Sequence, residues 1–276
     1  MWRVTWQRFA RSKLALGALI YVVLITVIAI AAPLLSRYDP NGVDLIHRLS
    51  APTAQHYFGT DDLGRDVLTR MMFGARVSLT IGFAATAIAL IVGSFLGALA
   101  GYYGSVIDWL VSRLIEIVLC FPFLFLLLGI VALFNPSMTT ILVALGLTSW
   151  TTEARFIRGE FMKVREMEFA QAARARGARD ARIIFRHLLP NALAPVLVSA
   201  SFGVAHAILV ESALSFLGLG VAVPMASWGS ILSIAEEFID SAWWLVIFPG
   251  FAIFTTVAAF NIIGDRFRDA LDPRSE

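Results

Sequence analysis

The chain has 276 residues, of which 58% are hydrophobic and 15% charged, and its formal net charge is +2. A soluble domain of this length has about 45–50% apolar and about 25% charged residues, so the composition excludes an ordinary soluble protein. The apolar residues occur in runs of roughly twenty, enough to cross a hydrocarbon core, whereas strands of a membrane barrel alternate over about ten residues. The composition therefore predicts an all-α, polytopic membrane bundle.

The first apolar run covers residues 14–35 and follows a basic tail, residues 1–13. A secretory signal has an apolar region of only about 7–15 residues, so this longer run predicts a retained first transmembrane helix. The four basic residues of the tail are Arg3, Arg8, Arg11 and Lys13.

Five further runs complete a prediction of six spans: 79–101, 109–134, 138–154, 194–217 and 242–263. The run at 138–154 is the weakest, because hydroxyl side chains dilute its second half. We expect an external segment at 36–78, a five-helix core at 79–263 that includes a loop at 155–190, and a tail at 264–276.

The positions of Lys and Arg predict the orientation of the chain. The first tail has four basic residues and no acid, and residues 155–187 have nine basic residues against four acids. Residues 36–78 are balanced, with five of each sign. With six spans, both termini and the basic loop are expected in the cytoplasm, and the protein in the inner, cytoplasmic membrane.

Small residues and a proline predict details of helix packing. Gly93, Gly97 and Gly101 repeat every four residues, which places a smooth stripe on one helix face and permits close approach of a second helix. Pro122 removes a backbone hydrogen bond within the third predicted span and is expected to kink it. Cys120, the single cysteine, lies in an apolar run and is expected to be buried.

The basic loop has the composition of short helices. We expect one helix to end at Gly177, and a second to be capped by Asp180 and stopped at Pro190. A protruding helix pair with apolar positions and an arginine-rich edge favours docking on another protein. The alternative is a helix pair that lies on anionic lipid headgroups.

The same loop carries a spaced pattern. Gln171-Ala172-Ala173 is followed after three residues by Gly177, and after nine more by His187-Leu188-Leu189-Pro190. This resembles the EAA loop of ABC importer permeases, which has Glu-Ala-Ala, three residues, Gly, nine residues and Ile-x-Leu-Pro. Gln171 and His187 depart from that pattern, which puts the need for a charge at position 171 in question.

Other segments resemble the second, or C-type, permease of dipeptide, oligopeptide and nickel importers. They are the motifs that begin at His56 (HYFGTDDLGRD), Glu211 (ESALSFLGLG), Trp228 (WGS) and Gly264 (GD, continuing to DALDPR). The resemblance runs nearly from end to end of the chain. It implies the six-helix fold of a type I ABC importer permease, with a cytoplasmic coupling helix.

The resemblance also implies the partners. These are a homologous second permease that completes a heterodimer, two cytosolic ATPases, an external solute-binding protein and membrane lipids, with no nucleic acid. ATP and Mg would be bound by the ATPases, and this chain would hold no cofactor and no metal. The implied coupling residues are Glu168, Phe169, Gln171, Ala172, Ala173, Arg176, Gly177, Arg186, His187, Leu189 and Pro190.

The residues themselves agree that energy comes from another chain. The sequence has two lysines, Lys13 and Lys163, and neither belongs to a G-K-[ST] phosphate loop. No pattern of catalytic residues is recognisable, so we do not expect an enzyme. The alternatives are an ion-coupled secondary carrier, which would not need the basic loop, a nickel or glutathione importer, and a structural subunit without a translocation path.

Five residues within the spans have either a transport or a structural role: Arg113, Glu116, Pro122, His206 and Glu211. Charged residues within a membrane usually indicate a functional site, but Arg113 and Glu116 are spaced to form an ion pair on one helix face. In the 36–78 segment Asp61, Asp62 and Asp66 suggest either a divalent ion or, as we favour, turn and helix capping by Thr60 and Asp61. The tryptophans at 228, 243 and 244 are expected in an interfacial belt.

Overall fold

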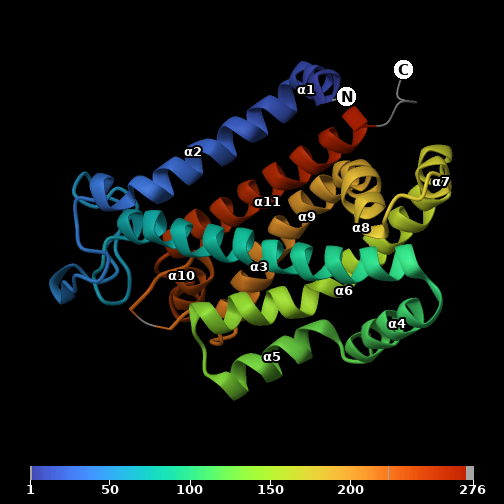
Figure 1. The fold of residues 1–276 in the computed structure, drawn as a ribbon. Coiled ribbons are helices and arrows are strands. Elements are labelled where there is room, and N and C mark those ends of the chain that lie inside the picture. Colours follow the sequence, from blue (N-terminus) through green and yellow to red (C-terminus); the bar gives the residue numbers. More distant parts are fainter. Residues whose placement is uncertain (1, 223, 272–276) are drawn as a thin grey trace.

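The computed structural model describes residues 2–222 and 224–271, and Figure 1 shows that helices dominate this part of the chain. Within it, strand pairing is limited to an isolated bridge between Thr60 and Asp66. The all-helical prediction is therefore confirmed. The last residues of the predicted C-terminal motif, 272–274, lie outside the described residues.

The helices follow one another along the chain as α1 (Trp2–Arg11), α2 (Lys13–Leu35), η1 (Leu45–His47), α3 (Val67–Tyr103), α4 (Ser105–Leu119), α5 (Phe123–Phe134), α6 (Met138–Arg165), α7 (Glu168–Ala175), α8 (Asp180–Arg182), η2 (Ile183–Leu188), α9 (Leu189–Phe216), α10 (Trp228–Ala235), η3 (Glu236–Phe238) and α11 (Trp244–Leu271).

In the part of the chain that the structure describes, four helices are long and apolar enough to cross a membrane: α2, α3, α9 from Pro195, and α11. The α4–α5 pair makes a fifth if it is counted as one bent span, so the predicted number of six is not reached. The missing one is the 138–154 run, which lies in α6. Hydroxyl groups and a carboxylate reduce the apolar character of that helix, at Thr148, Ser149, Thr151, Thr152 and Glu153.

Helices α3 and α6 pack along the glycine stripe, as the spacing predicts. A Cβ atom added to Gly97 would lie 2.5 Å from the carbonyl oxygen of Ala154, and one added to Gly101 would lie 2.6 Å from that of Arg158. A Cβ added to Gly93 would lie 2.6 Å from the Cβ of Glu153. Backbone therefore meets backbone, and α6 is held closely against α3 over several turns.

The third predicted span is broken. Helix α4 ends at Leu119, α5 begins at Phe123, and their axes differ by 80°. Pro122 is the N-cap of α5, so the predicted disruption at this proline is confirmed, although it is a break between two helices and not a kink within one. Cys120 lies in the break and is exposed in this chain, contrary to the expectation of burial.

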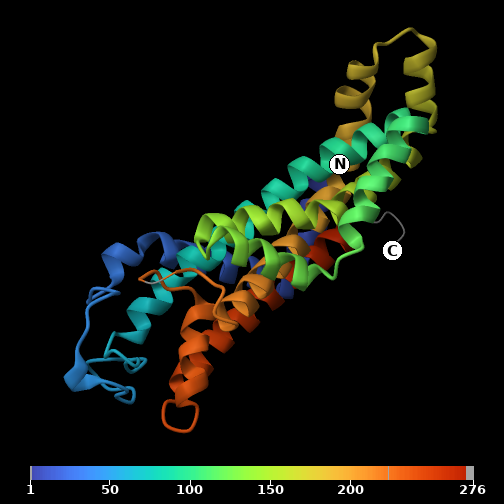
Figure 2. The same ribbon diagram turned by 90° about the horizontal axis from the view of Figure 1, so that it is seen from below.

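Helices α2, α3, α9, α10 and α11 share the largest apolar core. Figures 1 and 2 both place the start of α1, the end of α11 and the α7–α8 segment at one end of the bundle, with residues 36–66 at the other. The short α1 was not expected. Its Phe9 is buried against Phe267 of α11, with ring centroids 6.0 Å apart.

The 36–66 segment is fixed to the bundle by polar contacts. Asp66 is the N-cap of α3 and accepts from Thr69 N at 2.8 Å, so the expected helix capping by Thr60 and Asp61 is wrong. The expected turn capping is present, because Asp61 Oδ1 accepts from Leu63 N at 3.0 Å and from Arg65 N at 2.9 Å. Asp61 is also buried and ion-paired with Arg65 at 2.7 Å. Arg70 Nε lies 3.3 Å from Asp61 Oδ2, at ion-pair distance but outside hydrogen-bond geometry. Ion pairing and capping thus account for these acids.

Two of the three expected belt tryptophans are core residues. The indole of Trp228 is fully buried and donates to Met71 O at 3.1 Å, and that of Trp244 donates to Thr60 O at 3.0 Å. Buried indoles usually have such a hydrogen-bond partner. Trp243, by contrast, is exposed, so a position at a membrane interface fits that residue alone.

Candidate transport cavity and coupling hairpin

A helical hairpin protrudes beyond the ends of α3 and α6 (Figure 2). Its first arm, α7, ends in a Schellman motif. Gly177 N–H donates to Arg174 O at 2.9 Å, and Ala178 N–H donates to Ala173 O at 3.1 Å. Gly177 has φ of +71°, a left-handed conformation that glycine adopts without steric cost. The predicted helix end at Gly177 is therefore confirmed.

The second arm differs from the expectation in two ways. Asp180 does not cap it, because its carboxylate accepts from the Tyr102 hydroxyl at 2.6 Å and so ties the hairpin to the end of α3. Pro190 does not stop it either, because α8 continues through the π-helical η2 directly into α9. Pro190 is the second residue of α9, directly after η2, and the helix continues past it although proline donates no backbone hydrogen bond.

The hairpin is anchored by a small apolar cluster. Ala170, Ile183 and Leu188 are buried against Ile157 and Phe161 of α6. Most of the proposed coupling residues lie on the outside and are exposed: Glu168, Phe169, Gln171, Ala172, Arg176, Gly177, Arg186 and Pro190. The remaining three, Ala173, His187 and Leu189, are partly buried. The surface thus presents small and aromatic groups among arginines.

A cavity of about 550 Å³ lies among α3, α6, α9 and the α4–α5 break. Helix α3 contributes its middle, at Ala85, Thr86 and Ala89, and the break contributes Phe121 and Phe123. Most of the lining is apolar or hydroxyl-bearing. Its further residues are Val118, Leu119, Leu126, Thr148, Ser149, Thr151, Thr152, Glu153, Phe156, Ser199, Phe202, Gly203, His206 and Ala207.

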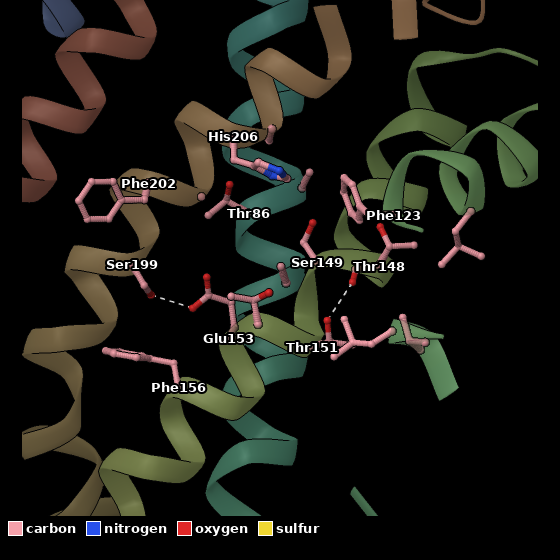
Figure 3. A pocket seen from close by; sticks show the side chains of 18 of the residues that line it. Thr86, Phe123, Thr148, Ser149, Thr151, Glu153, Phe156, Ser199, Phe202 and His206 are labelled. Carbon is pink, nitrogen blue, oxygen red and sulfur yellow. Dashed lines mark hydrogen bonds between the residues drawn. The ribbon is translucent and has the colours of Figure 1, made fainter. Parts of the chain in front are cut away.

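Glu153 is the acid of this cavity, and sequence reasoning missed it. Its carboxylate accepts from the hydroxyl of Ser199 on α9 at 2.7 Å (Figure 3), and the residue is 8% exposed. A signal was available. Ser149, Thr152, Glu153 and Phe156 have the i, i+3, i+4, i+7 spacing of one helix face, and all four line the cavity.

The polar residues singled out from the sequence do not form one site. His206 lines the cavity, with its ring 5.3 Å from that of Phe123, next to Pro122. Glu211 lies in a different place: it is fully buried and accepts from Ser78 at 3.1 Å and from Ser215 at 2.7 Å. Of the predicted group, His206 is therefore the residue that the cavity includes.

Arg113 and Glu116 form the predicted ion pair on α4, but both are more than half exposed in this chain. A second ion pair joins α4 to α6, in which Arg158 donates two hydrogen bonds to Asp108. Among residues 2–222 and 224–271, no group of three His, Cys, Asp or Glu side chains is placed to hold a metal ion.

Apolar helices of spanning length, a cavity among them and a helical hairpin beyond one end define a multi-pass membrane permease. The chain belongs to the family of binding-protein-dependent transport system inner membrane components, which matches residues 93–276. Residues 1–52 match the N-terminal TM domain of oligopeptide transport permease C. It is thus a permease subunit of an ABC importer, of the C type.

Relatives match over nearly the whole chain. The dipeptide transport system permease protein DppC of Alkalihalophilus pseudofirmus is 47% identical over 99% of this chain and 90% of its own length. The oligopeptide transport system permease protein OppC of Bacillus subtilis is 38% identical, also over 99% and 90%. The glutathione transport system permease protein GsiD of Pectobacterium atrosepticum is 37% identical over 99% and 91%.

Solved structures share the fold. The inward-facing MetNI methionine ABC transporter matches with a TM-score of 0.56 and 20% identity, covering 72% of this chain and 95% of the other. An amino acid ABC transporter with histidines matches with a TM-score of 0.55 and 19% identity, covering 74% and 93%. At this identity the likeness concerns the fold alone.

Proposed function

We propose that this chain is one of two homologous permeases in an importer that moves di- or oligopeptides across the cytoplasmic membrane by alternating access. The observation that carries the proposal is the continuity of α6. One helix lines the cavity with residues 148–156 and then continues to Arg165, where the hairpin begins. A force on the hairpin is thereby transmitted to the cavity wall.

The hairpin is the proposed docking site for a cytosolic ATPase. Its outer face has exposed aromatic groups, Phe169 and Phe185, beside arginines, which suits a groove in a folded protein. ATP and Mg would be bound by the two ATPases, and an external solute-binding protein would deliver the solute. The basic hairpin shares one end of the bundle with both termini, which supports a cytoplasmic position for all three.

Peptides are the proposed solute because dipeptide and oligopeptide permeases are among the similar proteins. Glutathione, itself a tripeptide-like solute, is the second candidate, since a glutathione permease is 37% identical. The test is ATP-driven uptake into proteoliposomes that contain the complete complex and its solute-binding protein. Uptake of alanyl-alanine supports the proposal, whereas uptake of glutathione or nickel without any peptide contradicts it.

Docking is tested with a matched pair of substitutions. Ala172→Arg places a large charged side chain on the exposed face of α7, and Ala54→Arg does the same at the other end of the bundle. We expect Ala172→Arg to reduce co-purification of the ATPases about tenfold, because an obstructed interface residue costs about 1.4 kcal/mol or more. Ala54→Arg should leave it unchanged. Equal recovery with both variants would contradict docking on α7.

A further inference from the structure

Four of the hydroxyl groups that line the cavity already donate hydrogen bonds within the protein. Thr86 Oγ1 donates to Gly82 O at 2.7 Å, and Thr148 Oγ1 donates to Ala144 O at 2.7 Å. Thr151 Oγ1 donates to Thr148 O at 3.4 Å, and Ser199 donates to Glu153. These hydroxyl protons are already used within the protein, so the oxygens face a ligand with their lone pairs.

Glu153 adds the one formally acidic group to this lining. Ser199 contacts its Oε2, while among residues 2–222 and 224–271 no side chain donates to Oε1 and no Lys or Arg forms an ion pair with the carboxylate. Oε1 has no hydrogen-bond partner in the described part of the chain, yet it is not a fully buried atom, so it is accessible from the cavity. A carboxyl group that is nine-tenths buried and has no ion-pair partner is neutralised either by a proton or by a bound cation.

Aromatic rings surround the carboxylate. Figure 3 shows Glu153 directed toward Ser199, with Phe202 and Phe156 on either side, while Phe123 and His206 face it from other walls. Ring faces attract cations, so a carboxylate beside such rings can bind an ammonium group. Among the described residues that line the cavity, there is no Lys or Arg that would bind a carboxylate instead.

We propose that Glu153 and the surrounding phenylalanine rings bind the protonated amino group of the transported solute within the cavity. The proposal rests on the proposed function, in which the solute is a peptide, and it assigns the amino-terminal ammonium to this permease. Ser199 positions the carboxylate by its hydrogen bond from α9. Because α6 carries Glu153 and leads to the hairpin, the bound cation is attached to the helix that couples the two sites.

The site is tested by chemical labelling, independently of transport. The complete complex in nanodiscs, without nucleotide, is treated with N,N′-dicyclohexylcarbodiimide, and modification of Glu153 is measured by mass spectrometry. We expect phenethylammonium to reduce labelling of Glu153 about tenfold and neutral 2-phenylethanol to have no effect, since ion pairing contributes about 1.4 kcal/mol or more. The exposed Glu116 is the internal reference.

Peptides distinguish failure of this site from failure of the proposed function. Protection by alanyl-alanine but not by N-acetyl-alanyl-alanine supports both. Protection by phenethylammonium alone supports the cation site and contradicts peptide as the solute. Equal labelling with and without phenethylammonium overturns the cation site, whatever the uptake assay gives.

Uptake kinetics provide the second readout. Glu153→Gln keeps the size of the side chain and an acceptor for Ser199 but removes the charge. We expect it to reduce the maximal rate of alanyl-alanine uptake about tenfold, with the solute-binding protein saturated, because a charge-assisted hydrogen bond is lost. Glu116→Gln should leave the rate unchanged. Wild-type uptake by Glu153→Gln would overturn the proposal.

Discussion

Two of the buried carboxylates, Glu211 and Glu153, lie between long helices of the bundle and have contrasting surroundings. Glu211 is fully enclosed, and serine hydroxyls reach both of its oxygens: Ser78 on α3 contacts Oε2, and Ser215 on α9 contacts Oε1. Glu153 has one hydroxyl on one oxygen and a cavity beside the other. Burial alone therefore does not distinguish a structural acid from one that binds a ligand.

The difference lies in hydrogen-bond satisfaction. The two serines that contact Glu211 join α3 and α9 to the start of α10. Ser78 also accepts from Trp228 N at 3.3 Å, and Ser215 lies 3.3 Å from Ser227. An acid whose acceptor sites are filled by the protein stabilises the packing and has nothing left for a solute. An acid that has a carboxylate oxygen exposed to a cavity can still bind a solute.

Replacement of the enclosed acid should have the largest effect on stability. Glu211→Ala leaves the hydroxyls of Ser78 and Ser215 without their acceptor and opens a void, which should destabilise the fold by about 3 kcal/mol. The measurement is the thermal unfolding midpoint of the purified complex. Glu153→Gln, by comparison, should unfold near the wild-type midpoint. Equal midpoints for these two variants would remove the distinction drawn above.

The second-largest effect on stability is expected at Gly93, which packs against Glu153. In Gly93→Ala the new methyl group would lie 2.6 Å from the Cβ of Glu153 and 2.9 Å from Ala154 N, so α6 must move away from α3. We expect a loss of about 1–3 kcal/mol, as for other overpacked contacts, together with slower solute uptake. Gly159→Ala, also on α6 but with open space around its position, is the control and should unfold at or slightly above the wild-type midpoint, because alanine favours the helix over glycine.

Serines around the two carboxylates should give the smallest effects on stability, and the two effects should differ. Ser227 caps α10 in a capping box with Ser230, so Ser227→Ala should cost about 1 kcal/mol. Ser199→Ala removes one contact to an otherwise accessible carboxylate and should cost less than about 1 kcal/mol while reducing uptake. Unfolding midpoints and uptake rates of both variants check this. A larger stability loss in Ser199→Ala than in Ser227→Ala would indicate that Glu153 has a structural role.

Much of the fold could be predicted because lipid imposes a simple rule. Apolar runs of about twenty residues must become helices, which located α2, α9 and α11, and the spacing of Gly93, Gly97 and Gly101 predicted the α3 face that meets α6. The 80° break and the continuity across Pro190 could not be predicted in this detail. They depend on how the helices on either side of each proline pack.

The cavity was harder to predict than the hairpin. The hairpin follows from a local pattern, with Gly177 at a helix end, whereas the cavity brings together residues from α3, α5, α6 and α9. Glu153 lies near the end of the predicted 138–154 span and received no predicted role, because a hydropathy argument treats polar residues as dilution. The periodicity of the hydroxyls around it was the better guide.

The π-helical η2 has a consequence for the tolerance of this chain to changes in length. Leu189 N–H donates to Ile184 O, five residues back, so this stretch holds more residues per turn than an α-helix would. Loss of one residue between 183 and 188 would remove the extra residue of the π-helical stretch and restore the regular four-residue register, with little change in the direction of the hairpin. Loss of one residue from a regular α-helical part of α9 would instead turn everything before it by about 100° around the helix axis. The π-helical stretch is therefore a place where the chain can change in length without reorienting the hairpin.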